Sequence, residues 1–205
     1  MEVVCLDLEG VLVPEIWINF AKKTGIKALE PTTRDIPDYD VHMTQRLNIL
    51  KEHGLGLNDI QEVIAEMGPF PGAKEFVEWL RTHFQLIILS DTFYEFAHPL
   101  MKQLGWPTIF CHKLETDEKG MITTYKLRQP DQKREAVKAL HGLNYRVIAA
   151  GDSYNDTTML GEADKGFLFD APENVIKEFP QFPAIHGYAA LKEAIRNASV
   201  RDIPA

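Results

Sequence analysis

The chain has 205 residues, of which 45% are hydrophobic and 25% are charged, so it is long enough to bury a core of its own. Its 30 acidic and 22 basic residues give a net charge of −8, which argues against a nucleic-acid partner. No apolar stretch approaches the roughly 20 residues of a membrane span, and no signal peptide is recognisable. Cys5 and Cys111 lie in apolar surroundings, which favours free thiols and a cytoplasmic protein.

The first apolar run, at 3–6, is followed by Asp7, Glu9 and Gly10. Continuous Val/Leu runs are typical of parallel strands that are buried on both faces. Ligands of open α/β sheets bind just beyond the carboxyl ends of such strands. A carboxylate at that place can serve as a nucleophile or as a metal ligand.

The segment 14–71 departs from the strand pattern and predicts helices at 15–24, 39–53 and 58–67. Asn58 with Gln61 three residues later resembles a capping box at the start of the third helix. A helical insertion directly after the first strand would lie above the carboxyl edge of the sheet, where it can act as a lid. We therefore predict a core domain of residues 1–13 and 72–205 and a helical cap domain of residues 14–71.

Further strands are predicted at 86–89, 147–150 and 166–169, and helical periodicity appears at 73–80, 136–140 and 191–195. The segment 111–128 carries the turn signal Asp-Glu-Lys-Gly and predicts a hairpin or an edge strand. Strands that alternate with helices indicate an α/β fold, a Rossmann-like doubly wound parallel sheet covered on both faces.

Polar residues follow three of these strands and would meet at one edge of the sheet. Asp7 follows the first strand, Ser90 the second and Asp152 another. Carboxylates suit Mg²⁺, and a hydroxyl with the backbone N–H groups after it can hold phosphate oxygens. Lys133, near the start of a predicted helix, can neutralise charge in a transition state. The set suits phosphoryl transfer.

Four motifs in this order resemble those of the haloacid dehalogenase-like (HAD) phosphohydrolases: DLEGV at 7–11, SDT at 90–92, Lys133, and GDSYND at 151–156. The resemblance implies the HAD fold with a small helical cap. It also implies that Asp7 is the nucleophile, which forms an aspartyl-phosphate, and that Glu9 is the general acid/base. Mg²⁺ would be held by Asp7, the backbone carbonyl of Glu9, and Asp152.

The chain departs from the family pattern at two positions. The second acid of the first motif is usually Asp, and here it is the longer Glu9. In phosphoserine phosphatases Gly commonly follows the serine of the second motif, and here the residue is Asp91. The Asp91 side chain must turn from the phosphate or bind a cationic part of the ligand. For the third motif, Lys133 has nearby competitors in Lys126, Arg134 and Lys138.

Around these motifs the chain looks most like the phosphoserine phosphatase branch, which places a glutamate and an arginine near Glu15 and Arg46. Arg can bind the substrate carboxylate through two parallel hydrogen bonds, and Glu15 can bind the ammonium. His42 would share the helix face of Arg46, as a packed or solvated side chain. Asn155 is a candidate substrate contact, and Asp156 is expected to brace Lys133 or a metal-bound water.

Glu9 and the SDT motif also resemble a bacterial sub-branch whose members can pass phosphate from phosphoserine to homoserine. The resemblance therefore predicts a Mg²⁺-dependent phosphoserine phosphatase with this second acceptor. The alternatives are a phosphatase for another small phosphate ester and a non-catalytic phosphate-binding module. The expected partners are small molecules, without nucleic acid or membrane, and an oligomer is possible.

Overall fold

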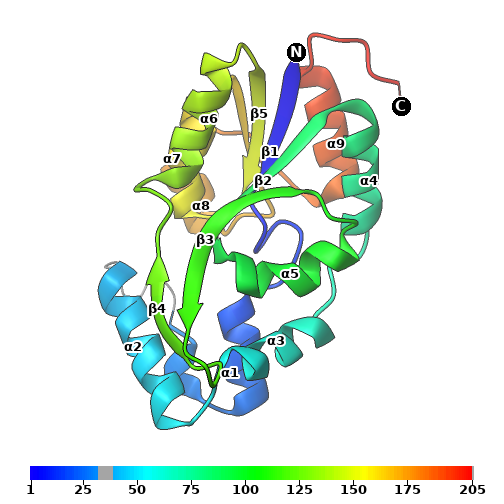
Figure 1. The fold of residues 1–205 in the computed structure, drawn as a ribbon. Helices are drawn as coiled ribbons and strands as arrows, with labels where there is room; N and C mark the ends of the chain where they lie inside the picture. Colours follow the sequence, from blue (N-terminus) through cyan, green and yellow to red (C-terminus); the bar gives the residue numbers. More distant parts are fainter. Residues whose placement is uncertain (32–38, 205) are drawn as a thin grey trace.

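A computed structural model describes residues 1–31 and 39–204. Its described residues form a seven-stranded sheet in the order β4-β3-β2-β1-β5-β6-β7, in which the neighbouring strands are parallel except for the antiparallel pair β3–β4 (Figure 1). The strands are β1 (Glu2–Leu6), β2 (Gln85–Phe93), β3 (Thr108–Thr116), β4 (Ile122–Lys126), β5 (Arg146–Gly151), β6 (Lys165–Phe169) and β7 (Ala184–Ile185).

The sheet is covered by helices on both faces, and β1 contributes to both cores. Val4 and Leu6 belong to one buried cluster, whereas Val3 and Cys5 belong to the other. Alternate side chains of a strand point to opposite faces, so this strand, which is buried on both sides, is apolar along positions 3–6. The first cluster includes side chains of α4 (Ala73–His83), α5 (Tyr94–Gln103) and α9 (Gly187–Ala198); the second includes those of α6 (Gln132–Gly142), α7 (Thr157–Glu162) and α8 (Glu173–Glu178). The predicted doubly wound α/β fold is confirmed.

The segment 111–128 forms the predicted hairpin at the edge of the sheet. Its turn is closed by Asp117, whose Oδ1 accepts hydrogen bonds from the N–H groups of Lys119 and Met121, both at 2.9 Å. Gly120 has φ +78°, a conformation that favours glycine. β3 extends beyond its pairing with β2, and β4 contacts α2 (Tyr39–Glu52) (Figure 1).

Helices follow β1 in the chain, as predicted, and lie beyond the carboxyl ends of the strands (Figure 1). They are α1 (Ile16–Thr24), the 3-10 helix η1 (Lys27–Leu29), α2, and α3 (Leu57–Glu66). α1 packs on η1 and α3, and α3 packs on α5. The division into a core and a cap of residues 14–71 stays a prediction, and residues 32–38 of that segment lie outside the described part.

The predicted capping box of α3 is wrong. The helix begins one residue earlier, at Leu57, and its N-cap is Gly56. The Gly56 N–H donates to Asp59 Oδ2 at 2.7 Å, while the Gln61 amide donates to the Glu95 carbonyl at 2.7 Å. Asp59 therefore makes the capping hydrogen bond in the first turn, and Gln61 bonds the helix to α5.

The remaining short elements, the 3-10 helix η2 (Tyr154–Asp156), α7, α8 and β7, are too brief for periodicity to identify. Within the described ranges, none of the helices is long and apolar enough to cross a bilayer.

Candidate active site

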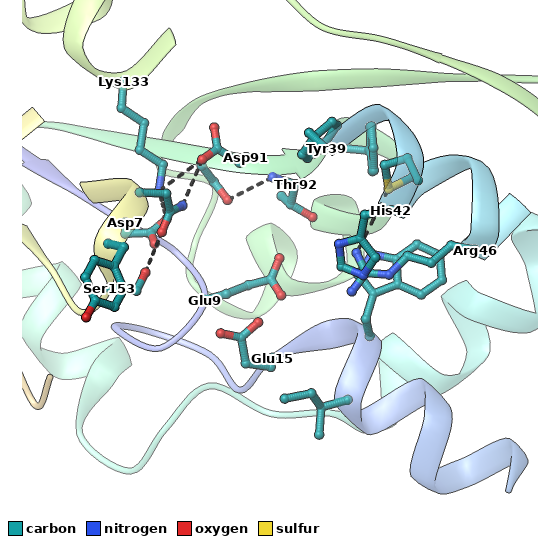
Figure 2. A pocket seen from close by; sticks show the side chains of 17 residues that line it. Asp7, Glu9, Glu15, Tyr39, His42, Arg46, Asp91, Thr92, Lys133 and Ser153 are labelled. Carbon is teal, nitrogen blue, oxygen red and sulfur yellow. Dashed lines mark hydrogen bonds and ion pairs between the residues drawn. The ribbon is translucent and has the colours of Figure 1, made fainter. Parts of the chain in front are cut away.

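A cavity of about 270 Å³ opens at the carboxyl edge of the sheet, between the ends of β1 and β2 and the helices α1 and α2 (Figure 2). One end of it is lined by groups of the sheet edge and the other by groups of the helices. The lining residues are Asp7, Glu9, Glu15, Trp17, Ile18, Tyr39, His42, Met43, Arg46, Ser90, Asp91, Thr92, Phe93, Lys133, Ser153, Tyr154 and Asn155.

Asp7 and Lys133 form a buried ion pair at the sheet end of the cavity. The Asp7 N–H donates to the Ala150 carbonyl of β5 at 3.0 Å, which fixes its backbone beside the sheet. Lys133 Nζ lies 2.9 Å from Asp7 Oδ1 and 2.7 Å from Asp156 Oδ1. Burial and the Asp156 carboxylate raise the pKa of Asp7 above its ordinary value. Burial alone would lower the pKa of Lys133, but Asp156 and Asp7 outweigh it and raise that pKa, so the ammonium stays charged.

Three carboxylates gather at this end and form a candidate cation site. Asp7, Asp152 and Asp156 each offer an oxygen within 4.8 Å of the others. Such an all-oxygen set suits a hard divalent cation. A Cβ at Gly10 would lie 2.3 Å from Asp152 Oδ2, so glycine lets the chain pass this carboxylate closely.

The three carboxylates differ in their other partners. Lys133 bonds Asp156 Oδ1, and the N–H groups of Asp152 and Ser153 bond Asp156 Oδ2 at 2.9 and 3.1 Å. In Asp7, Oδ1 takes both Lys133 and the N–H of Leu8, so Oδ2 is the oxygen that can take a further partner. Asp156 thus braces Lys133 with one oxygen and caps the turn with the other, whereas Asp7 keeps an oxygen that can bind a cation.

Glu9 occupies the middle of the cavity. Its Oε2 accepts the N–H of Ile16, the first residue of α1, at 2.8 Å. Burial and the neighbouring Glu15 carboxylate raise the pKa of Glu9 to about 8. Figure 2 shows the Glu9 and Glu15 carboxyl groups side by side. At neutral pH Glu9 therefore carries a proton that it can donate inside the cavity.

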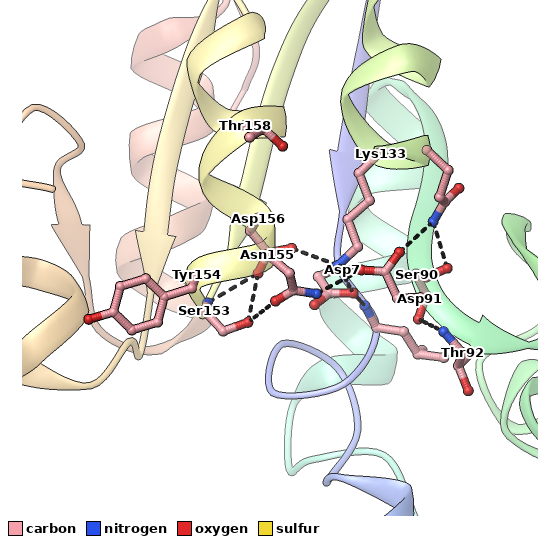
Figure 3. Close-up of polar contacts among 12 residues, drawn as sticks. Asp7, Ser90, Asp91, Thr92, Lys133, Ser153, Tyr154, Asn155, Asp156 and Thr158 are labelled. Carbon is pink, nitrogen blue, oxygen red and sulfur yellow. Dashed lines mark hydrogen bonds and ion pairs between the residues drawn. The ribbon is translucent and has the colours of Figure 1, made fainter. Parts of the chain in front are cut away.

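Ser90 and Asp91 lie at the end of β2. The buried Ser90 hydroxyl accepts the N–H of Thr92 at 3.2 Å. The Asp91 carboxylate accepts the Gln132 amide at 3.1 Å on Oδ1 and the Asn155 amide at 2.8 Å on Oδ2 (Figure 3). The Asp91 side chain is thus engaged by the protein.

Further groups surround the Asp91 carboxylate. Lys133 Nζ lies 3.7 Å from Oδ2, and His112 Nε2 lies 3.6 Å from Oδ1. Burial on its own would raise the pKa of Asp91, but Lys133, His112 and Asn155 hold it below its ordinary value. Asp91 is therefore ionised at neutral pH.

Arg46 lies on α2 at the helical end of the cavity. Its Nη2 donates to the Pro31 carbonyl at 3.0 Å, and its guanidinium stacks 4.5 Å above the Trp17 ring. Burial lowers the pKa of Arg46 to about 10. Among the described residues its buried Nε has no hydrogen-bond partner. His42 Nε2 lies 2.9 Å from the same carbonyl, so the buried His42 belongs to the packing of Arg46.

A family model of haloacid dehalogenase-like hydrolases matches residues 1–164. Phosphoserine phosphatase ThrH of Pseudomonas aeruginosa is 68% identical over 203 residues, which cover 99% of both chains. The chain belongs to the haloacid dehalogenase-like hydrolases. Phosphoserine phosphatase of Pseudomonas syringae pv. tomato is 65% identical over 99% of this chain and 86% of its own length. The crystal structure of phosphoserine phosphatase from T. onnurineus has the same fold, with a TM-score of 0.73, 24% identity, and coverage of 96% of this chain and 94% of that one.

The structure of this HAD hydrolase brings the predicted site residues together. Eight of them line the one cavity, and Asp152 lies in the acidic cluster beside Asp7. The competitors of Lys133 lie elsewhere: Lys126 pairs with Glu115 on the hairpin, and the side chains of Arg134 and Lys138 are about half exposed.

Sequence reasoning missed several polar residues of the site. Tyr39 and Thr92 line the cavity, and Gln132 and His112 contact Asp91. Thr92 is the last residue of the recognised SDT motif but was given no role, and Gln132 adjoins Lys133, so position in or beside a motif was an available signal. His112 comes from β3, and only the sheet pairing brings it beside Asp91.

Proposed function

We propose that this HAD hydrolase is a Mg²⁺-dependent phosphoserine phosphatase that acts through an aspartyl-phosphate on Asp7. The observation that carries the proposal is the juxtaposition, in one cavity, of the Asp7–Lys133 ion pair with Glu9, Glu15 and Arg46. The sheet end holds the groups that phosphoryl transfer needs. The helical end holds one acid and one buried cation, which match the ammonium and carboxylate of an amino acid. The names of the Pseudomonas relatives support the same substrate.

The proposed reaction begins when Asp7 attacks the phosphorus. Lys133 and Ser90 hold phosphate oxygens, and the serine oxygen leaves with the proton of Glu9. The raised pKa of Glu9, about 8, supports this acid role because the proton is present at neutral pH. Mg²⁺, held by Asp7, Asp152 and the Glu9 carbonyl, would offset the repulsion between the carboxylates and the phosphate.

In the second step an acceptor hydroxyl gives its proton to Glu9 and attacks the phosphorus, which frees Asp7. We propose that the acceptor is water or homoserine. Homoserine carries the head group of serine, so Arg46 and Glu15 can bind it after serine leaves. A hydroxyl held in line competes strongly with water through proximity.

The test follows phosphate release from phosphoserine with and without isotope-labelled homoserine. We expect phosphate in both reactions and labelled phosphohomoserine in the second, without ATP. If phosphoserine is hydrolysed but the labelled homoserine is not phosphorylated, the protein is a phosphatase without transferase activity. No reaction of phosphoserine, but hydrolysis within a panel of sugar phosphates and phosphoglycolate, would assign it another small phosphate ester. If no ester is hydrolysed, the remaining alternative is a non-catalytic phosphate-binding module.

A further inference from the structure

We propose that Asp91 is a positioning residue, whose carboxylate fixes Asn155 and Lys133 relative to Ser90. The inference deepens the proposed function and rests on it for the substrate. Asp91 lies on β2, Asn155 on η2, and Lys133 with Gln132 on α6. Asp91 contacts both of the other elements, which carry groups that face the cavity (Figure 3).

The chemistry of the contacts requires a carboxylate. Each oxygen of Asp91 accepts an amide N–H, from Gln132 on Oδ1 and from Asn155 on Oδ2. Asparagine would turn an NH₂ group toward one of these donors and lose that bond. Glycine or alanine would lose both.

On the η2 side, Asp91 sets the orientation of the Asn155 amide. The Asn155 Nδ2 donates to Asp91 at 2.8 Å, and its Oδ1 accepts the Ser153 hydroxyl at 2.5 Å. An amide nitrogen has two N–H groups, so one remains for a phosphate oxygen in the cavity that Asn155 lines. Without Asp91 the amide can rotate and lose that direction.

On the α6 side, the buried Gln132 joins Asp91 to the strand that carries Ser90. Its Nε2 donates to the Ser90 carbonyl at 2.7 Å as well as to Asp91. Gln132 precedes Lys133, whose Nζ lies 3.7 Å from Asp91 Oδ2. The bonds thus fix the first turn of α6, and with it the base of the Lys133 side chain, against the end of β2.

His112 supports the Asp91 carboxylate from β3. Its Nδ1 accepts the backbone N–H of Arg128 at 3.1 Å, so in the neutral ring the proton is on Nε2. That Nε2 faces Asp91 Oδ1 at 3.6 Å. His112 is buried, so the carboxylate is enclosed on this side as well.

The test is a double-mutant cycle of Asp91→Ala, Asn155→Ala and both together, with kcat and KM measured on phosphoserine and on p-nitrophenyl phosphate. We expect each single change to lower kcat/KM about tenfold or more on both substrates, since the positioned groups face the phosphate. The kcat/KM of the double variant should be no more than about threefold below that of the less active single variant. If the two residues acted independently, the loss of kcat/KM in the double variant would be the product of the two single losses. The difference between that product and the observed loss is the coupling that the cycle measures.

Asp131→Asn is the matched control, because it neutralises the exposed N-cap residue of α6 without touching the donors of Asp91, and asparagine keeps an oxygen for the Thr158 hydroxyl. Asparagine also tolerates the positive φ of 46° at that position. We expect its kcat/KM within twofold of the wild type. Asp91→Asn, nearly equal in size to the native residue, should give a loss smaller than that of Asp91→Ala, and it serves as the single variant if Asp91→Ala does not fold.

An Asp91→Ala or Asp91→Asn protein with kcat/KM within twofold of the wild type would overturn the proposal, as would multiplicative losses in the cycle. A wild type that hydrolyses p-nitrophenyl phosphate but not phosphoserine would contradict the proposed substrate alone. The cycle on the aryl ester would then still decide the role of Asp91.

Discussion

Two buried carboxylates stand at opposite ends of β1, and their surroundings differ. Asp7 and Glu2 are each 5% exposed. Asp7 faces two further carboxylates and one ammonium, so its charge is poorly balanced. Glu2 accepts bonds from the Ser199 hydroxyl at 2.7 Å, the Val200 N–H at 3.0 Å and Arg201 Nε at 2.9 Å.

The two environments shift the pKa values in opposite directions. Burial and Asp156 raise the pKa of Asp7. Burial would also raise the pKa of Glu2, but the hydrogen bonds from Arg201 and Ser199 outweigh it and lower that pKa. A little-exposed acid thus has a lowered pKa where donors surround it, and a raised pKa where like charges surround it.

The largest expected effect is that of Asp7→Asn. The change removes the proposed nucleophile, so phosphate release should fall at least about a thousandfold. Because the pKa of Asp7 is raised, its charged form is disfavoured in the folded state, and neutral asparagine should unfold at the same or a higher temperature. Steady-state kinetics and thermal unfolding check the two results. Near-normal turnover would exclude Asp7 as the nucleophile.

Removal of the metal is expected to have a comparable effect on activity. Chelation should stop phosphate release, and Mg²⁺ should restore it. Mg²⁺ should also raise the unfolding temperature of the wild type, since a cation that binds only the folded state stabilises it. Asp152→Asn should weaken that thermal response. Full activity in metal-free protein would contradict the proposed cofactor.

Arg46→Ala tests the helical end of the cavity, where a buried cation is only partly satisfied. A hydrogen bond to a charged group contributes ~1.5–3 kcal/mol, so kcat/KM for phosphoserine should fall tenfold or more. Hydrolysis of p-nitrophenyl phosphate, which has no carboxylate, should change much less. Arg46→Lys is the matched control that keeps the charge and loses the paired hydrogen bonds. Equal losses on both substrates would place Arg46 in phosphate chemistry or in folding.

The sheet and the gathering of polar residues at its carboxyl edge were predictable because the signal is local. Apolar runs identify buried strands, and the residue after each run lies at the carboxyl edge, so Asp7, Ser90 and Asp152 could be placed together. The N-terminus of α3 was misjudged because Asn58, Asp59 and Gln61 offered competing polar side chains, and backbone geometry decided between them.

Contacts that depend on strand pairing at the sheet edge, or on the course of the C-terminal segment, could not be predicted. His112 reaches Asp91 only because β3 pairs with β2. Glu2 finds its donors almost two hundred positions away, in the segment after α9. Nothing in the sequence around Glu2 distinguishes it from an exposed acid at a strand start. The role of Asp91 was left open for the same reason, because its partners come from three elements.

The smallest expected effect is that of Glu2→Gln, and it affects stability alone. Glutamine keeps one acceptor but loses the charge that Arg201 contacts, so the free energy of unfolding at pH 7 should fall by about 1–3 kcal/mol. The candidate active site lies at the other end of β1, so kcat and KM should stay within twofold of the wild type. Denaturant unfolding and steady-state kinetics measure the two quantities.

The pH dependence of the stability of Glu2→Gln, compared with that of the wild type, tests whether the charge of Glu2 is responsible for this loss. A carboxylate whose pKa is lowered by folding contributes stability above its unfolded pKa, about 4.3, and that contribution is lost as pH falls through the folded value. The stability difference between wild type and Glu2→Gln should therefore be constant from pH 7 to about pH 5 and shrink below that. Arg201→Gln should show the same loss with the same acid limit, because it removes the other half of the pair. A difference that does not shrink in acid would mean that packing at this end, and not the charge of Glu2, stabilises the start of β1.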